Sequence, residues 1–290
     1  MHSQKIHNKK LILPVLIFLA GCLALAAVLY HSYRTNLKHM RAVTELNATT
    51  YAERLQNDMN RGVAITDTLE EIVLSENGKI DNFQKVAGNL MTDFVQSIQI
   101  APNGVVTDIY PEAGNEAGKI DLIHDESRGE ICRYGRDKNI VTMQGPFDLK
   151  QGGRGIAIRN PVYLECPDGT SAFWGFTIVI IRIPEVFEKS VQSLTQFGYD
   201  YCLTKTVSPL SDDTEVVSAS GNILKEPITF EFEFCGSTFG LEVMPTDGWN
   251  HGWNILPQLV FGICIILLLT GLTVIVLVVE RHREILKKWR

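Results

Sequence analysis

The sequence lacks the motifs on which most enzymes and metal sites depend. It has no Cys-x-x-Cys pair, no Gly-x-Ser-x-Gly motif and no phosphate-binding loop. Only four histidines lie between the two long apolar runs, and no two of them are three or four residues apart: His31, His39, His124 and His251. Zinc ligands and catalytic groups need characteristic spacings to converge on one point. We therefore expect no metal, no cofactor and no catalytic residue, and an extracytoplasmic enzyme is the weakest interpretation.

Basic residues are scarce outside the two ends of the chain. Eight of the 27 Lys and Arg residues lie in residues 1–10 and 280–290, together with two of the 33 acidic residues. The segment between therefore holds 19 basic and 31 acidic residues, a net charge near −12. Such a balance argues against nucleic acid or an anionic membrane surface as the main partner of this segment.

Two apolar runs are long enough to cross a membrane. Residues 11–30 and 259–279 contain no charged side chain, and about 20 residues of helix span the hydrocarbon layer. No Lys or Arg lies just before the second run, whereas five follow it, which predicts a cytoplasmic C-terminus: Arg281, Arg283, Lys287, Lys288 and Arg290. We expect a multi-pass protein of the inner (plasma) membrane, with the intervening segment outside the cytoplasm and with Trp249 and Trp253 at the outer interface.

A cleaved lipoprotein signal is the alternative for the first run. Residues 19–22, Leu-Ala-Gly-Cys, resemble a lipoprotein box in which Cys22 would carry the lipid. The apolar run continues through Leu29, where a lipoprotein usually becomes polar at once. We therefore expect an uncleaved anchor, and lipidation of Cys22 stays open.

Cysteine is rare in the segment between the membrane helices. Four occur there, Cys132, Cys166, Cys202 and Cys235. An oxidising compartment permits two disulfides, and three pairings are possible. We expect Cys132 to pair with Cys166 and Cys202 with Cys235, because each pair then falls within one subdomain. The alternative is four reduced, buried thiols.

Proline is absent from residues 31–75, and glycine occurs there only once. Small or apolar residues recur along this stretch at spacings of three and four, which predicts a helix that packs along one seam: Ala52, Leu55, Met59, Gly62, Thr66, Leu69 and Val73. Asn77-Gly78 then ends the helix. We expect a stalk helix over residues 31–78 with a homodimer contact along this seam. The alternative is that the seam packs only on its own domain, above all near Val73.

The rest of the segment alternates between helical and strand periodicity, which predicts an α+β fold. We expect a distal domain at residues 79–184. It contains a short helix from Phe83, a hairpin turning at Asn103-Gly104, a helix over residues 125–136, and strands over residues 140–144, 155–164 and 172–183. A helix from Pro184 and a second, smaller sheet form a proximal domain at residues 185–254. The second membrane helix takes residues 255–280, and residues 281–290 begin a cytoplasmic helix.

Several short motifs occur in a recognisable order: Ser97 to Pro102 (SIQIAP), the loop from Tyr110-Pro111 to Gly114-Asn115, Gly145-Pro146-Phe147, Asn160-Pro161-Val162-Tyr163 and Trp174-Gly175. Over residues 46–187 this set resembles the CHASE family of extracytoplasmic sensor domains. The resemblance implies a PAS-like distal module that holds a small ligand and a PAS-like proximal module that relays to the membrane. It also implies an output domain of the histidine kinase or diguanylate cyclase type. We expect that domain beyond residue 290 or in a partner. The alternative function is a membrane-anchored protein that binds a partner without sensing a small ligand.

The resemblance also nominates positions for ligand contact. In the plant cytokinin receptors of this family, a pocket threonine aligns with Arg159, and a ligand-holding aspartate aligns near Ser127 or Arg128. These differences argue against an adenine-type ligand.

Strand alternation gives an independent argument about the pocket. Ile156 and Ile158 lie on one face of their strand, and Ala157 and Arg159 on the other. If the apolar face packs on helices, Arg159 projects into a cavity, where a guanidinium binds a carboxylate or phosphate. We expect a small anionic ligand such as an organic or amino acid, in a site formed by Arg159, Tyr163, Phe147, Trp174, Arg128, Lys150 and Arg154. The alternatives are that Arg159 pairs with Asp108 or Asp148, and that Lys150 and Arg154 are merely solvated.

Overall fold

The computed structural model describes residues 2–112, 118, 120–150, 152–249 and 254–289. The chain divides into two units. One comprises Met1–Ala42 with Asp247–Arg290, and the other comprises Val43–Thr246. The predicted position of Trp253 lies outside the described residues.

Two helices in the first unit are long and apolar enough to cross a membrane. They are the N-terminal part of α1 (His2–Ser75) and α5 (Ile255–Lys288). The two helices approach closely at glycines. A Cβ atom on Gly262 would lie 2.3 Å from Leu25 Cδ1, and one on Gly21 would lie 2.9 Å from Ile266 Cγ1. Small residues permit this close packing of helices, which is common in membranes.

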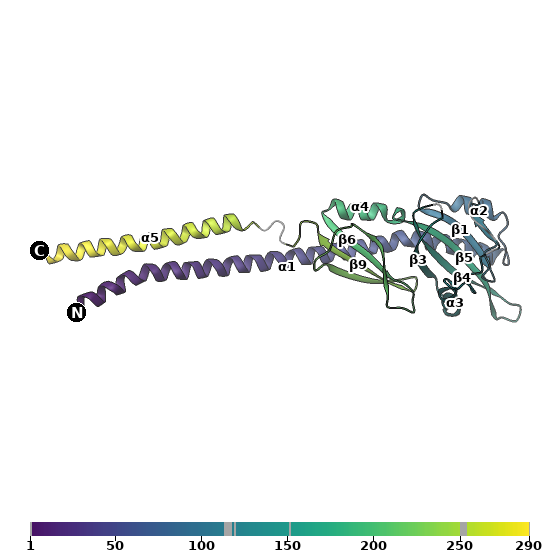
Figure 1. Ribbon diagram of the computed structural model, residues 1–290, viewed down its shortest axis with the longest axis horizontal. Coiled ribbons are helices and arrows are strands. Elements are labelled where there is room, and N and C mark those ends of the chain that lie inside the picture. The colour runs from purple at the N-terminus through teal and green to yellow at the C-terminus, as the bar shows by residue number, and fades with distance from the viewer. Residues whose placement is uncertain (1, 113–117, 119, 151, 250–253, 290) are drawn as a thin grey trace. The chain divides into compact units, whose positions relative to one another are not determined.

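A five-stranded antiparallel sheet forms the distal part of the second unit (Figure 1). Its strands are β1 (Val95–Pro102), β2 (Asp108–Tyr110), β3 (Thr142–Asp148), β4 (Arg154–Glu165) and β5 (Ser171–Ile183), in the order β2-β1-β5-β4-β3. Helices α2 (Phe83–Leu90) and α3 (Gly129–Lys138) belong to the same part. The hairpin from β1 turns at Asn103 and Gly104, whose φ angles of 54° and 84° are left-handed, as predicted.

A four-stranded antiparallel sheet forms the proximal part. After the short helix η1 (Glu185–Phe187) and α4 (Glu188–Gln196) come β6 (Tyr199–Thr206), β7 (Thr214–Ala219), β8 (Ile228–Phe234) and β9 (Ser237–Pro245), in the order β7-β6-β9-β8. The long N-terminal helix, two antiparallel sheets and C-terminal helix confirm the predicted mixture of helix and sheet, and they are consistent with a PAS-like sensor fold.

The second half of α1 is a core element of its own domain. Along the predicted seam, Leu55, Met59 and Leu69 are at most 1% exposed and belong to one apolar cluster with residues of both sheets, such as Ile158 and Leu241. Gly62 allows the close approach, since a Cβ atom there would lie 2.7 Å from Ile158 Cδ1.

The prediction of a homodimer contact along this seam is therefore wrong for these residues. The alternative, in which the seam packs on its own domain, is the arrangement in the structure. Dimerisation by another surface stays a prediction. Between residues 51 and 61 the exposed positions of α1 are polar, among them Glu53, Asn57 and Asn60.

The predicted disulfides are also wrong, because all four cysteines are free thiols. Cys202 lies opposite Glu242 of β9, whereas Cys235 lies in the turn just before that strand. Five strand positions, about 16 Å, separate residues 242 and 237, and a disulfide joins Cα atoms less than about 7 Å apart. Cys132 is buried on α3, whereas Cys166 lies in the turn after β4.

Candidate functional site

A cavity of about 560 Å³ lies against one face of the distal sheet. The opposite face, with Ile98, Ile156 and Ile158, packs in the same apolar cluster as α1. The register places Gln99 of β1 beside Ile178 of β5, and Ile178 beside Arg159 of β4, so these three cavity residues form one row across the sheet. The next row consists of Ser97, Ile180 and Ala157. The cavity therefore has a floor of alternating polar and apolar side chains.

The remaining walls come from other segments of the distal part. Ser127 and Arg128 precede α3, Gln144 and Phe147 belong to β3, and Lys150 follows β3. Apolar side chains close the cavity toward β2, namely Ile109, Ile120 and Leu122. A volume of this size suits a small organic ligand, which a few polar groups would orient.

The most unusual wall residue is Arg159, which is only 4% exposed. Its Nε and Nη1 atoms have no hydrogen-bond partner. Among the described residues, no carboxylate lies within the 4.0 Å ion-pair distance, so the alternative pairs with Asp108 and Asp148 are not formed. Burial lowers the pKa of Arg159, and the positive charge of Arg128 lowers it further. A buried, unpaired guanidinium is energetically costly and would be stabilised by an anion in the cavity.

The Asp125 carboxylate already has hydrogen-bond and ion-pair partners within the turn that leads into α3. Its Oδ1 atom accepts hydrogen bonds from the Ser127 and Arg128 backbone N–H groups, at 2.9 and 3.0 Å, and its Oδ2 atom lies 3.8 Å from Arg128 Nη1. The Ser127 hydroxyl also donates to Oδ1, and this bond is the main reason that the pKa of Asp125 is lowered. This turn explains why α3 starts at Gly129 rather than at the predicted residue 125.

Two polar contacts shape other walls of the cavity. Gln99 Nε2 donates to Ser97 Oγ at 3.0 Å. Gln144 Nε2 donates to the Ser127 carbonyl at 2.9 Å, while Gln144 Oε1 is buried without a partner. The cavity thus contains an acceptor as well as donors that a ligand could satisfy.

Four of the seven side chains predicted for the site line this cavity, and three lie elsewhere. Arg159, Arg128, Phe147 and Lys150 line it, and they include both positions that the family resemblance nominates. The Tyr163 hydroxyl donates to the Arg136 carbonyl at the end of α3. Trp174 Nε1 donates to the Gly78 carbonyl at 3.0 Å, beyond the end of α1. Arg154 is exposed, and its Nη2 atom donates to the Val216 carbonyl at 3.2 Å.

Irregularities in the strands explain why some of the predicted residues lie outside the cavity. The register between β4 and β5 shifts between Val162 and Tyr163, and nearby Gly175 has a φ of 156°. Because of this irregularity, Trp174 packs with the apolar cluster that includes α1. Phe173 packs with the apolar cluster on the other face of the sheet. Sequence analysis missed Ser97 and Gln99. Their alternation with Ile98 and Ile100 was a usable signal, because polar residues at every second position of a buried strand indicate a polar cavity face.

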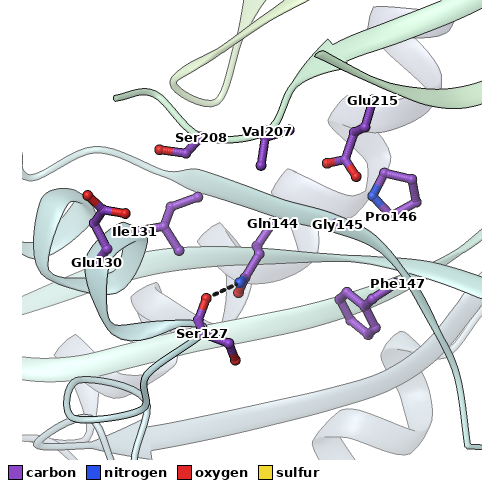
Figure 2. Close-up of a pocket in the computed structure, with 10 residues that line it drawn as sticks. All are labelled: Ser127, Glu130, Ile131, Gln144, Gly145, Pro146, Phe147, Val207, Ser208 and Glu215. Carbon is purple, nitrogen blue, oxygen red and sulfur yellow. Dashed lines mark hydrogen bonds between the residues drawn. The ribbon is translucent and has the colours of Figure 1, made fainter. Parts of the chain in front are cut away.

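A second cavity, of about 290 Å³, lies between the distal and proximal sheets (Figure 2). Glu130, Ile131 and Pro146 line it from the distal part, and Val207, Ser208 and Glu215 from the proximal part. Ser127, Gln144 and Phe147 line both cavities. The β3–β4 register shifts between Gln144 and Phe147, so the irregular part of β3 separates the two cavities.

A buried lysine lies beside this second cavity. Lys205 has no exposed surface, and its Nζ atom lies 3.4 Å from Glu215 Oε1 and donates to the Thr206 carbonyl. Burial lowers the pKa of Lys205, and the Glu215 carboxylate partly offsets this effect. Glu215 thus neutralises a charge that would otherwise be unpaired inside the proximal part.

Comparison with protein families gives a match to the CHASE domain over residues 31–215. This match covers more than half of the 290 residues, so the chain belongs to the CHASE domain family, as the sequence motifs indicated. Two candidate membrane helices flank the sensor domain, consistent with a membrane protein whose sensor lies outside the cytoplasm. No curated protein sequence matches the chain.

Solved structures with a similar fold include an extracellular ligand-binding receptor from Desulfohalobium retbaense DSM5692. It is 13% identical with a TM-score of 0.51, and the match covers 69% of this chain and 39% of that one. This chain therefore corresponds to well under half of that protein's length. The ligand-binding domain of the Campylobacter jejuni chemoreceptor Tlp3, in complex with 4-methylisoleucine, is 12% identical with a TM-score of 0.47, and the match covers 77% and 96% of the two chains. The periplasmic sensory domain of C. jejuni Tlp1 is 14% identical with a TM-score of 0.47, covering 76% and 99%.

Proposed function

We propose that this chain is the input module of a membrane receptor that binds a small anionic molecule outside the cytoplasm. The observation that carries the proposal is the Arg159 guanidinium, which is buried in the wall of the distal cavity with two nitrogen atoms, Nε and Nη1, that have no partner. Proteins rarely keep such a group without a partner, since its burial costs several kcal/mol unless a counter-charge is present. A ligand carboxylate or phosphate would supply that counter-charge.

The membrane helices support the receptor part of the proposal. The basic residues at the C-terminal end of the chain favour a cytoplasmic C-terminus, and in this proposal the cavity therefore lies outside the inner (plasma) membrane. In this proposal, ligand binding changes the second unit, and the change passes through α1 or α5 to an output domain of the histidine kinase or diguanylate cyclase type. That domain belongs either to the same polypeptide or to a partner protein. The chain itself acts as sensor, without catalytic activity of its own.

The test is calorimetric titration of the full chain in lipid nanodiscs with a panel of small organic anions, amino acids and inorganic phosphate. We expect at least one anion to bind, and Arg159→Met to weaken that binding by 2–5 kcal/mol (an order-of-magnitude range), about thirtyfold or more. Arg154→Met is the matched control, because Arg154 is an arginine of the same strand that lies outside the cavity. It should bind as the wild type does.

Two results would count against the proposal. Equal affinity of wild type and Arg159→Met for every bound anion would show that the guanidinium is not the anchor. Absence of binding to any member of the panel would favour the alternative, a membrane-anchored protein that recognises a protein partner.

A further inference from the structure

We infer that the ligand of the distal cavity is an aliphatic dicarboxylate, with two separated negative charges and no ammonium group. This inference rests on the proposed function and narrows the class of ligand. It follows from where the cavity carries positive charge, what it offers to an ammonium group, and which apolar side chains line it.

Three positively charged side chains from separate segments line the cavity. Arg159 projects from β4, Arg128 precedes α3, and Lys150 follows β3. The Arg128 charge is close enough to Arg159 to disfavour its protonated form. Asp125, whose Oδ2 atom lies 3.8 Å from Arg128 Nη1, already offsets part of this repulsion, and a second ligand carboxylate within reach of Arg128 or Lys150 would offset it further.

The cavity offers little to an ammonium group. Among the described residues that line it, Asp148 is the only carboxylate, and its side chain is exposed. Asp125 is engaged by Ser127 and Arg128. The unpaired Gln144 Oε1 is a single neutral acceptor, which suits a hydroxyl or water better than an ammonium ion with three donors.

The cavity also has apolar lining beside its charged and polar side chains. Ala157, Ile178, Ile180 and Leu122 line it, and methylene groups would pack against these side chains. The volume of about 560 Å³ is also far larger than an inorganic anion requires, whereas it falls in the range for small organic ligands. An organic dianion with an aliphatic centre fits both properties.

The experiment compares ligands that share a carbon skeleton and differ at one end. Succinate, butyrate and 4-aminobutyrate all have four carbons, with a carboxylate, a methyl and an ammonium at the second end; aspartate adds an ammonium to succinate. Each is titrated into the full chain in nanodiscs, and the series is repeated with five and six carbons. We expect a dicarboxylate of one length to bind about tenfold or more tightly than its monocarboxylate and amino counterparts, equivalent to about 1.4 kcal/mol.

Two variants locate the second charge. Arg128→Gln should reduce the affinity for the dicarboxylate about tenfold and leave that for the monocarboxylate unchanged, because only the dianion reaches this side chain. Lys150→Gln removes an exposed cation at the rim and should have a smaller effect, about threefold or less. Even if a variant folds poorly, the ligand series with the wild-type chain shows whether the cavity prefers a dicarboxylate.

Each outcome bears on the inference. Equal or tighter binding of 4-aminobutyrate, aspartate or their longer analogues would overturn it, as would the absence of binding by every dicarboxylate of four to six carbons. If another anion then binds and depends on Arg159, the dicarboxylate inference fails while the proposed function stands. If no anion binds, both fail.

Discussion

At the scale of single residues, the distal cavity holds an apparent conflict between stability and function. Arg159 is buried, and the described part of the chain gives its Nε and Nη1 atoms no acceptor. A position that served only stability would be better filled by an apolar side chain, since a buried charge without a partner opposes folding. The arginine is therefore more easily explained by ligand binding than by packing.

The first prediction follows from this conflict. Without ligand, Arg159→Met should raise the free energy of unfolding by about 1–2 kcal/mol, because the thioether fills similar space without a buried charge. Thermal and denaturant unfolding of the full chain measure the effect, and Arg154→Met should stay within about 0.5 kcal/mol of the wild type. A loss of stability in Arg159→Met would mean that the native guanidinium is satisfied within the protein.

The second prediction concerns the buried pair of Lys205 and Glu215. Because burial lowers the pKa of Lys205, the unfolded chain binds its proton more tightly than the folded chain, and stability from this group increases as pH rises toward the ordinary value of 10.5. Glu215→Gln removes the carboxylate that supports the charged form. It should lower the free energy of unfolding by about 1–3 kcal/mol at neutral pH, and the deficit should shrink as pH rises.

Unfolding curves at several values between pH 7 and pH 10 measure this dependence. Glu231→Gln, at an exposed position of β8, is the control and should follow the wild type at each pH. A deficit that does not change with pH would show that Lys205 does not titrate in this range.

At the scale of elements, α1 has two different environments. Its first part contacts α5 at glycines, and its later part is buried in the sensor core through Leu55, Met59 and Leu69. The spacing of three and four along the later part correctly indicated a helix with one packing face. Periodicity does not identify the partner of that face, and the sheets of the same chain take the place of the expected second copy.

The third prediction concerns the contact between the two membrane helices. Gly262→Val should separate α5 from α1, because even a Cβ atom at this position would lie 2.3 Å from Leu25 Cδ1. Gly271→Val is the matched control on the same helix, since a Cβ atom there would meet nothing within 4 Å.

Cysteine crosslinking in nanodiscs measures the separation. In a background in which Cys22 and Cys264 are replaced by Ala, cysteines at positions 21 and 266 should crosslink efficiently, and Gly262→Val should reduce the yield severalfold. A yield that Gly262→Val and Gly271→Val lower equally would contradict a specific contact at Gly262.

At the scale of the whole sensor unit, β3 connects the distal cavity to the proximal sheet. Gln144 and Phe147 line both cavities, and the register shift between them makes this part of the strand irregular. A ligand that orders this wall would also change the second cavity, whose other side includes Val207, Ser208 and Glu215. We therefore expect the two parts of the unit to respond together.

The fourth prediction tests this coupling by amide hydrogen exchange. A saturating anion identified by titration should slow exchange in β3 and also over residues 207–216 of the proximal part, because closure of the shared wall reduces local opening. Arg159→Met with the same anion is the control and should show neither change. Slower exchange confined to the distal sheet would mean that binding does not reach the proximal part through β3.

Local patterns in the sequence determined much of this architecture. Two uncharged runs predicted the membrane helices, Asn103-Gly104 predicted a hairpin, and the alternation of Ile156, Ala157, Ile158 and Arg159 correctly placed the arginine on the face opposite the apolar core. These features depend on helical and strand periods and on backbone preferences, which neighbouring residues set.

Which distant residues meet depends on the tertiary structure. It separated the cysteines that were expected to pair, moved Trp174 to the face of α1 through the irregularity near Gly175, and placed Tyr163 against the end of α3. It also brought Ser97, Gln99 and Gln144 to the cavity that Arg159 lines. Such contacts depend on strand order, register shifts and helix packing across many residues, and periodicity within one segment carries no information about them.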